Sequence, residues 1–249
     1  MIILKSDREL GLMHESGKIA FSAMEKAKAA VRPGITTIEL DRIIENEIKH
    51  FNAVPSFKGY GGFPGSACIS VNDEVVHGIP SKRVLHEGDI VSIDLGALFK
   101  GYHSDMARTF AVGNIAPEHE KLVRVTEECF FKALEVMVPG YRVGDISEAV
   151  EKHAEAHGYG VVKDLVGHGI GRDLHEDPSV PNFTGRTKGP KLREGMVLAV
   201  EPMINLGTWK VYFNEEDGWT VTTADGEYSA HYENTVGIRD GEPIILTMP

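Results

Sequence analysis

One eight-residue stretch, which occurs twice in diverged form, decides the expected fold. Residues Glu87–Asp94 read EGDIVSID, and residues Glu194–Glu201, 107 positions further along, read EGMVLAVE. Each stretch is a run of mainly apolar residues with a glycine near its start and a carboxylate at its end. This pattern is typical of a buried β-strand. We therefore expect two related strands, each of which ends in an acidic side chain.

A pair of helices is expected before the first of these strands. Ser6–Glu9 has the form of a capping box, which predicts a helix that continues to about Val31, where a proline-glycine pair follows. Thr36–Glu39 repeats the capping pattern ahead of a second helix, which is predicted to end at about Phe51. The first strand is thus expected to follow two helices.

A second pair of helices is expected before the second strand. Pro117 favours the start of a third helix that ends at Pro139-Gly140, and Asp145 and Glu148 are predicted to cap a fourth. The shared order predicts an α+β fold with two pseudo-symmetric halves, roughly 6–112 and 113–249, in a single domain over 1–249. Its central antiparallel β-sheet is expected to be covered by helices. Chance similarity is the alternative, since Glu-Gly before a strand is common.

Composition narrows the class of protein. The 249 residues include 26 basic and 37 acidic side chains, a formal net charge of −11, which argues against stable nucleic-acid binding through phosphate neutralisation. Only two cysteines are present, which excludes a disulfide framework and favours a reducing compartment. No apolar run has the length of a signal peptide core or a membrane span. We expect a cytoplasmic protein without membrane contact.

Two aspartates are predicted to share one face of a hairpin. Asp94 closes an apolar strand, where an unpaired carboxylate is costly. If the chain turns at Lys100-Gly101 with a two-residue loop, Asp105 lies opposite Gly96 and diagonally next to Asp94. A loop one residue longer would place the two carboxylates on opposite faces.

Three further residues complete a candidate metal site. Glu201 closes the second strand, Glu233 is expected on the return strand of a hairpin that turns at Asp225-Gly226, and His168 lies between two glycines. Each residue alone has an ordinary explanation, such as a turn cap or a solvated side chain. Four carboxylates that lie close together cannot all stay ionised without counter-charge. Two divalent cations would neutralise them, and this oxygen-rich set suits Mn, Fe(II), Co or Zn.

These residues resemble those of the methionine aminopeptidases, metallopeptidases with the pita-bread (creatinase/aminopeptidase) fold. The short interval between Glu201 and Glu233 is similar to that of type I enzymes, and a start at residue 1 without a cysteine-rich extension is similar to their bacterial form. The resemblance extends over nearly the whole chain, and its motifs are Gly59–Ser70, Val76–Pro80, Asp94, Asp105, Gly167–Gly171, Leu174–Glu176, Glu201-Pro202 and Tyr232–Asn234.

The resemblance implies a metal set and a reaction. One ion would be held by Asp105, His168, Glu201 and Glu233, and the other by Asp94, with Asp105 and Glu233 bridging. The implied reaction is hydrolysis that removes the initiator methionine from peptides and nascent proteins, with a small second residue favoured. A metal-bridging water is the implied nucleophile, and Glu201 is the implied proton shuttle.

Two histidines and an apolar pocket are implied to act on the substrate. His175 would donate to the developing oxyanion, and His77 would hydrogen-bond the peptide and assist proton transfer. The pocket for the methionine side chain would be lined by Phe57, Tyr60, Phe63, Cys68 and Trp219. In an ideal Asp225-Gly226 hairpin, however, Trp219 would face away from Glu233, so its place in the pocket requires a bulge.

Partners and rival functions follow from the same resemblance. The implied partners are N-terminal methionyl peptides and nascent chains, with transient contact to the ribosome, and the chain is expected to act as a monomer. One rival is a metallohydrolase of the same fold that cleaves before proline. Another is a catalytically silent binding module, which should have lost metal ligands, whereas all five are present here.

Overall fold

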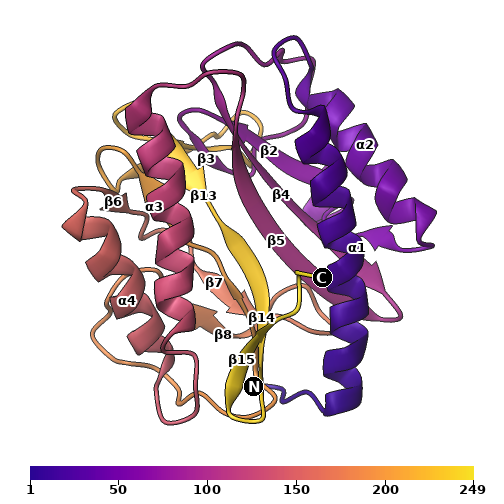
Figure 1. The fold of residues 1–249 in the computed structure, drawn as a ribbon, viewed down its shortest axis with the longest axis vertical. Helices are drawn as coiled ribbons and strands as arrows, with labels where there is room; N and C mark the ends of the chain where they lie inside the picture. The colour runs from indigo at the N-terminus through magenta and orange to yellow at the C-terminus, as the bar shows by residue number, and fades with distance from the viewer.

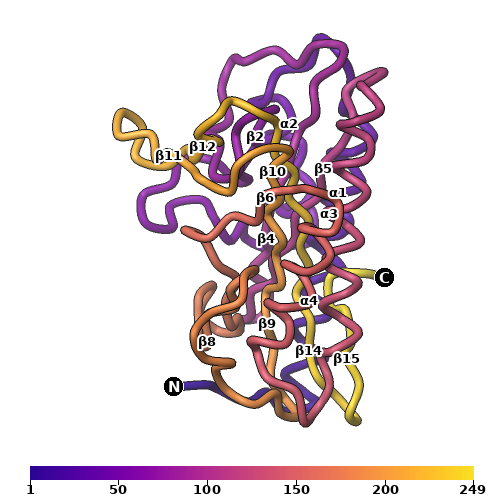
Figure 2. Tube along the Cα trace, turned by 90° about the vertical axis from the view of Figure 1, so that its left-hand side faces the viewer, coloured from indigo at the N-terminus to yellow at the C-terminus, as the bar shows by residue number.

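In the computed structural model, which describes residues 1–249, four helices cover one face of an antiparallel sheet (Figures 1 and 2). Figure 2 shows the helices on one side of the sheet and β8, β11 and β12 on the other. The helices are α1 (Asp7–Ala30), α2 (Thr37–His50), α3 (Pro117–Leu134) and α4 (Val143–Ala156), with a 3-10 turn, η1, over Tyr60–Gly62.

The main sheet has nine strands. Seven of them lie side by side in the order β1-β4-β5-β14-β9-β7-β8, and outside this order β2 pairs with β4 and β15 pairs with β14. All its pairs are antiparallel. Its strands are β1 (Val54–Pro55), β2 (Ala67–Val71), β4 (Ile90–Phe99), β5 (Tyr102–Ala111), β7 (Gly167–Gly169), β8 (Glu176–Val180), β9 (Val197–Val200), β14 (Glu233–Arg239) and β15 (Glu242–Ile245).

Two small sheets of three strands flank the main sheet, in the orders β13-β10-β6 and β11-β12-β3. The sheet β13-β10-β6 contacts α3 and α4, whereas β11 and β12 lie on the side of the main sheet away from the helices (Figure 2). Their strands are β3 (Glu74–Val76), β6 (Gly160–Val161), β10 (Met203–Asn205), β11 (Val211–Phe213), β12 (Val221–Thr223) and β13 (Ser229–His231).

The first two helices form where the capping patterns predict them. The amide of Thr36 donates to Glu39 Oε2 at 2.9 Å, which satisfies a donor that has no partner within the helix. In α2 the buried Leu40, Ile44 and Ile48 recur every four residues and pack toward the sheet. The bounds of α1 and α2 agree with the prediction to within one residue at their carboxyl ends.

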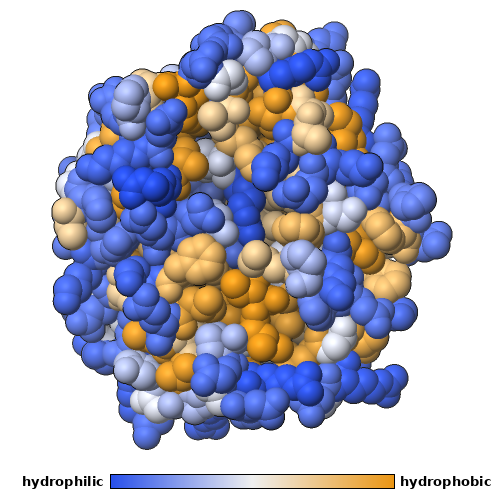
Figure 3. All heavy atoms as spheres, in the orientation of Figure 1, coloured by the Kyte–Doolittle hydropathy of each residue, from blue (hydrophilic) through white to orange (hydrophobic).

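Each helix pair covers its own apolar cluster. One cluster is drawn entirely from Ile19–Val112, and the other is drawn, apart from Ile90, from Leu122–Ile238. On the helix-covered face, apolar side chains also gather between the two pairs, around β14 and β15 (Figure 3). The sheet is therefore the common layer on which both helix pairs pack.

The predicted β4–β5 register is confirmed. Phe99 pairs with Tyr102 across a two-residue loop, and Gly96 pairs with Asp105. Both loop residues have positive φ, 50° at Lys100 and 83° at Gly101, as a tight turn that follows the twist of the strands requires.

Three predicted boundaries are wrong. β4 continues beyond Asp94 to Phe99, because the hairpin to β5 supplies partners for its whole length. The third helix ends at Leu134, before the Pro139-Gly140 pair, and tight turns fill the interval. The fourth begins at Val143, so Asp145 lies within its first turn, where it accepts from the Arg142 amide at 2.7 Å.

The predicted hairpin at Asp225-Gly226 is also wrong. β12 pairs with β11 and β3, whereas β13 pairs with β10, so the segments on either side of this turn join different sheets. The local turn pattern is present, but tertiary pairing decides the partners of the flanking strands. Trp219 therefore does not oppose Tyr232.

No helix of the structure combines the length and apolar character that a membrane crossing requires.

Two glycine-to-alanine substitutions should change stability in opposite directions. At Gly96 an added Cβ would lie 2.4 Å from the Ser104 carbonyl oxygen, whereas at Gly11, on the exposed side of α1, it would meet nothing within 4 Å. Gly96→Ala should lower the free energy of unfolding by about 1–3 kcal/mol through overpacking. Gly11→Ala should raise it by about 0.5–1 kcal/mol because alanine favours helix. Urea unfolding at equal metal content measures both, and a neutral Gly96→Ala would contradict the packing described.

Candidate metal centre

Five side chains of metal-ligating type lie on neighbouring strands of the main sheet. The strands run side by side in the order β4-β5-β14-β9-β7. In that order they supply Asp94, Asp105, Glu233, Glu201 (directly after β9) and His168. Because adjacent strands are about 4.8 Å apart, side chains from all five can converge only if they share a face.

The register places the three acidic residues of β4, β5 and β14 on one face. Asp94 pairs with Ala107, and Ala107 pairs with Glu233 on its other side. Residues directly opposite one another share a face, as do residues two apart, so Asp105 belongs to it too. The small side chain of Ala107 leaves room between the carboxylates.

A second row across β14, β9 and β7 repeats this arrangement. His168 pairs with Ala199, and Ala199 pairs with Thr235 on β14. Glu201 lies two residues beyond Ala199, and again an alanine occupies the position between the ligands. The Thr235 hydroxyl fixes the neighbouring strand, since it accepts from the Asp105 amide and donates to the Asp105 carbonyl, both at 2.9 Å.

The glycines on either side of His168 allow β7 to lie close to its neighbours. A Cβ at Gly167 would lie 2.4 Å from the Ala199 carbonyl oxygen, and one at Gly169 would lie 2.2 Å from that of Asp177. Both distances are shorter than real contacts. The sequence pattern of a histidine between glycines therefore has a steric cause.

The four carboxyl groups lie in a strongly unfavourable setting for negative charge. Burial raises the pKa of Asp94 to about 7. Burial, followed by repulsion from neighbouring carboxylates, raises the pKa of Asp105, Glu201 and Glu233 well above the ordinary range. One buried oxygen each of Asp94, Asp105 and Glu233 has no hydrogen-bond partner. The carboxylates therefore require counter-charge and ligand bonds.

His168 is oriented to supply a nitrogen ligand. Its Nδ1 donates to the Gly169 carbonyl at 2.8 Å, so Nε2 carries the lone pair. Nε2 lies 3.6 Å from Glu201 Oε1 and 3.9 Å from Asp105 Oδ2. Burial lowers the pKa of the ring to about 4, so it is neutral at pH 7. One neutral imidazole among four carboxylates fits divalent ions of the Mn, Fe(II), Co and Zn class.

A pocket of about 210 Å³ opens above these residues. All twelve residues that the sequence singles out for the site lie in its lining. The carboxylates and His168 form its floor. The remaining seven complete this part of the lining, and they are Phe57, Tyr60, Phe63, Cys68, His77, His175 and Trp219.

The aromatic residues contact one another and the two further histidines. Trp219 lies edge-on to Phe63, with ring centroids 5.1 Å apart, and to His77, at 6.3 Å. Trp219 reaches the pocket because its segment leads into β12, and no bulge in a β12–β13 hairpin is involved. Tyr60 and His175 are joined by a 2.7 Å hydrogen bond between the phenol oxygen and Nδ1.

His231, which the sequence-based prediction omitted, lies beside two carboxylates of the floor but outside the lining of the pocket. Its side chain is 1% exposed, and its Nε2 lies 3.8 Å from Glu233 Oε2 and 4.0 Å from Glu201 Oε2. Neither ring nitrogen has a hydrogen-bond partner. With Asp94 and Glu233 it forms a group whose ligand atoms lie within 4.8 Å of one another. The sequence feature that could have indicated His231 is its position two residues before Glu233.

Five apolar lining residues were also omitted. They adjoin the functional residues in sequence, and they are Val76, Leu165, Val166, Leu174 and Met203. Their apolar character alone does not distinguish them from core residues, so only the pocket reveals them.

Comparison with known proteins agrees with this geometry. Residues 11–240 match the model of metallopeptidase family M24. A methionine aminopeptidase of Clostridium acetobutylicum is 55% identical over 249 residues, which are 100% of this chain and 99% of that protein. The crystal structure of a methionine aminopeptidase from Rickettsia prowazekii superposes with a TM-score of 0.98 at 40% identity, with full coverage of both chains.

A more distant structure shares the fold. The prolidase of Pyrococcus furiosus superposes with a TM-score of 0.80 at 25% identity, over 99% of this chain and 66% of the prolidase chain. The predicted pita-bread fold is therefore confirmed. The chain belongs to metallopeptidase family M24, among the methionine aminopeptidases, and is a hydrolase of that family.

Proposed function

We propose that this protein removes the N-terminal methionine from peptides and nascent proteins, with preference for a small second residue. The proposal rests on five side chains of metal-ligating type that lie on, or directly after, five neighbouring strands and line a pocket with aromatic and sulfur-containing side chains. Full-length similarity to proteins named methionine aminopeptidase supports it.

The floor of the pocket would hold two divalent ions. Asp105, His168, Glu201 and Glu233 would bind one, and Asp94 would bind the other with Asp105 and Glu233 as bridges. Each of the three residues left with an unpartnered oxygen would thereby gain a ligand bond. When bound, the ions would polarise the scissile carbonyl and activate a water for attack.

Three side chains would act on the reacting groups. Glu201 would take a proton from the attacking water and deliver one to the departing amine, because its carboxylate lines the pocket and can accept and return a proton. His175, whose Nδ1 is fixed by Tyr60, would present Nε2 to the developing oxyanion. His77 would hydrogen-bond the peptide around the scissile amide. Burial lowers the pKa of His77 to about 4, so its ring is neutral at pH 7.

The methionine side chain would lie among Phe57, Tyr60, Phe63, Cys68 and Trp219. Thioether sulfur makes favourable contacts with aromatic rings, and an unbranched side chain fits a pocket with an irregular lining. Burial and the nearby Asp94 charge raise the pKa of the Cys68 thiol, so this residue would act as an apolar contact rather than a nucleophile.

We also propose a domain organisation, a location and a set of partners for the whole protein. We propose a single catalytic domain over residues 1–249, built from halves at roughly 6–112 and 113–249, that acts as a monomer in the cytoplasm. Its substrates would be methionyl peptides and nascent chains, which it would meet through transient contact with the ribosome.

Replacement of the proton carrier should reduce turnover strongly. Glu201→Gln keeps the size of the side chain but removes its base, so kcat on Met-Ala-Ser should fall by about 10²–10⁴-fold. Steady-state kinetics with equal metal loading, checked by elemental analysis, measures the loss. Glu118→Gln, on the exposed first turn of α3, is the matched control and should keep wild-type kcat. A Glu201→Gln enzyme with wild-type kcat would refute the role.

A peptide panel should separate the proposed specificity from cleavage before proline. Met-Gly and Met-Ala substrates should be cleaved with kcat/KM at least about tenfold above Leu-Gly, since one apolar pocket must distinguish side chains of similar size. Ala-Pro should resist cleavage. Preference for Ala-Pro would instead assign a prolidase-like activity.

Chelation should abolish activity and lower the thermal midpoint, because four neighbouring buried or half-buried carboxylates would then lack counter-charge. Readdition of Mn, Fe(II), Co or Zn, one at a time, should restore both cleavage of Met-Ala-Ser and the midpoint. The ion that restores the highest kcat identifies a working metal. Full activity after metal is reduced well below one ion per chain would contradict the proposed centre.

A further inference from the structure

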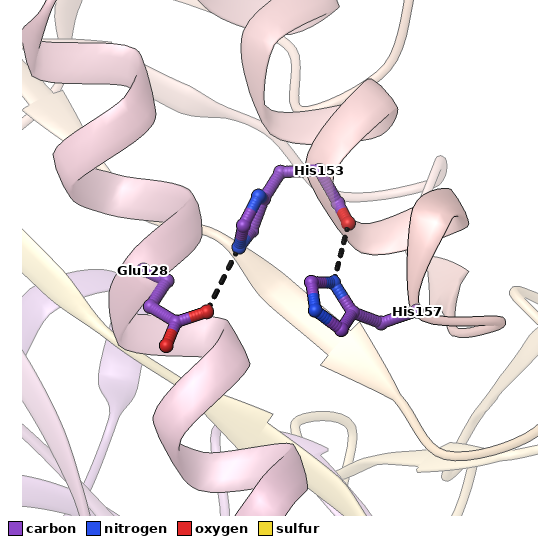
Figure 4. A group of neighbouring side chains, drawn as sticks. All are labelled: Glu128, His153 and His157. Atoms are coloured by element: carbon purple, nitrogen blue, oxygen red, sulfur yellow. Dashed lines mark hydrogen bonds and ion pairs between the residues drawn. The ribbon is translucent and has the colours of Figure 1, made fainter.

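A second group of metal-ligating side chains lies between α3 and α4, apart from the pocket. Glu128 comes from α3, His153 from α4, and His157 directly follows the last residue of α4. Figure 4 shows the carboxylate and the two imidazoles turned toward a common space between the helices. One ligand atom of each residue lies within 4.8 Å of the others. None of the three lines the pocket of the metal centre.

We propose that Glu128, His153 and His157 form a binding site for a borderline-soft divalent cation, of which Zn²⁺ is the representative. Two imidazole nitrogens and one carboxylate oxygen are a recurrent zinc donor set, which leaves a fourth position for water. This set is richer in nitrogen than the centre beneath the pocket, so the two sites should differ in their preference among cations.

The hydrogen bonds around His157 prepare it for this role. Its Nδ1 lies 2.9 Å from the His153 carbonyl, which can only accept, so Nδ1 carries the proton and Nε2 carries the lone pair. Figure 4 shows that second nitrogen on the side of the ring that faces Glu128. A protein ligand often has its other ring nitrogen fixed in this way by a backbone carbonyl.

The pair formed by Glu128 and His153 already has nearly the required spacing. His153 Nε2 donates to Glu128 Oε2 at 3.0 Å. A tetrahedral ion with bonds of about 2.0–2.1 Å holds neighbouring ligand atoms roughly 3.3 Å apart, so only a small movement is needed. Binding requires His153 to carry its proton on Nδ1 instead of Nε2, and the lone pair of Nε2 then forms the metal bond.

The surroundings favour an ionised carboxylate and access from solvent. The hydrogen bond from His153 lowers the pKa of Glu128, and Arg124 donates to its other oxygen at 2.5 Å. Side-chain exposure is 36% for Glu128 and 20% for His153, so an ion can enter without unfolding of either helix. A bound ion would join the carboxyl-terminal end of α4 to the middle of α3, on the outside of the apolar cluster beneath them.

The test is a count of Zn²⁺ ions in protein whose catalytic centre is first loaded with the activating ion. Equilibrium dialysis with elemental analysis should find one more Zn²⁺ per chain in wild type than in His157→Gln or His153→Gln. His86→Gln, which removes an exposed histidine, is the control and should keep the wild-type count. Glutamine is a good helix former, so the variants on α4 should fold.

Two further readouts separate this site from the catalytic one. When thermal unfolding is measured at increasing zinc concentrations, the midpoint temperature of the wild type should rise at a zinc concentration at which that of His157→Gln does not rise. In Glu128→Gln the rise should need at least tenfold more zinc. Because these residues lie outside the pocket, kcat on Met-Ala-Ser without added zinc should be equal in all variants. Equal zinc counts and equal midpoint shifts in wild type and both histidine variants would overturn the proposal, whatever the outcome of the activity tests.

Discussion

Four carboxylates that lie close together on one face of the central sheet, two of them buried and two half-buried, are the interaction on which the rest of the structure depends. At an effective dielectric constant of about 20, two like charges 4 Å apart repel by about 4 kcal/mol, and a buried carboxylate also loses its hydration. Burial raises the pKa of all four carboxyl groups, and repulsion between carboxylates adds to this effect at Asp105, Glu201 and Glu233. A fold that holds such a group together must therefore be rigid, and it must leave space for cations.

The sheet meets both requirements through register and through small residues. Each candidate ligand lies in a strand or directly after one, so its backbone is held by the hydrogen bonds of the sheet. Ala107 and Ala199 occupy the positions between the ligands, where a larger side chain would fill the space for an ion. The two helix pairs then cover the opposite face of the sheet and bury its apolar side chains in two clusters.

The floor and the rim of the pocket differ in kind. The floor is buried and formed by regular strands, whereas Tyr60 and His175 at the rim are exposed and lie in turns between strands. His77 adopts a positive φ of 62°, which is uncommon for a residue other than glycine and is typical of functional sites. The pocket thus combines candidate ligands that are fixed by the strands of the sheet with exposed side chains at the rim that a peptide can contact.

The sequence alone predicted the first two helices, the β4–β5 register and twelve of the seventeen residues that line the pocket, the five candidate metal ligands among them, because these depend on local spacing or on recognisable motifs. It did not predict the partners of β12 and β13, the extension of β4 to Phe99 or the place of His231 beside Glu201 and Glu233. It also did not reveal the group formed by Glu128, His153 and His157. Capping boxes and two-residue turns act over a few residues and leave a local pattern. Strand partners and contacts between helices are decided by packing of segments far apart in the chain, so only the tertiary structure determined them.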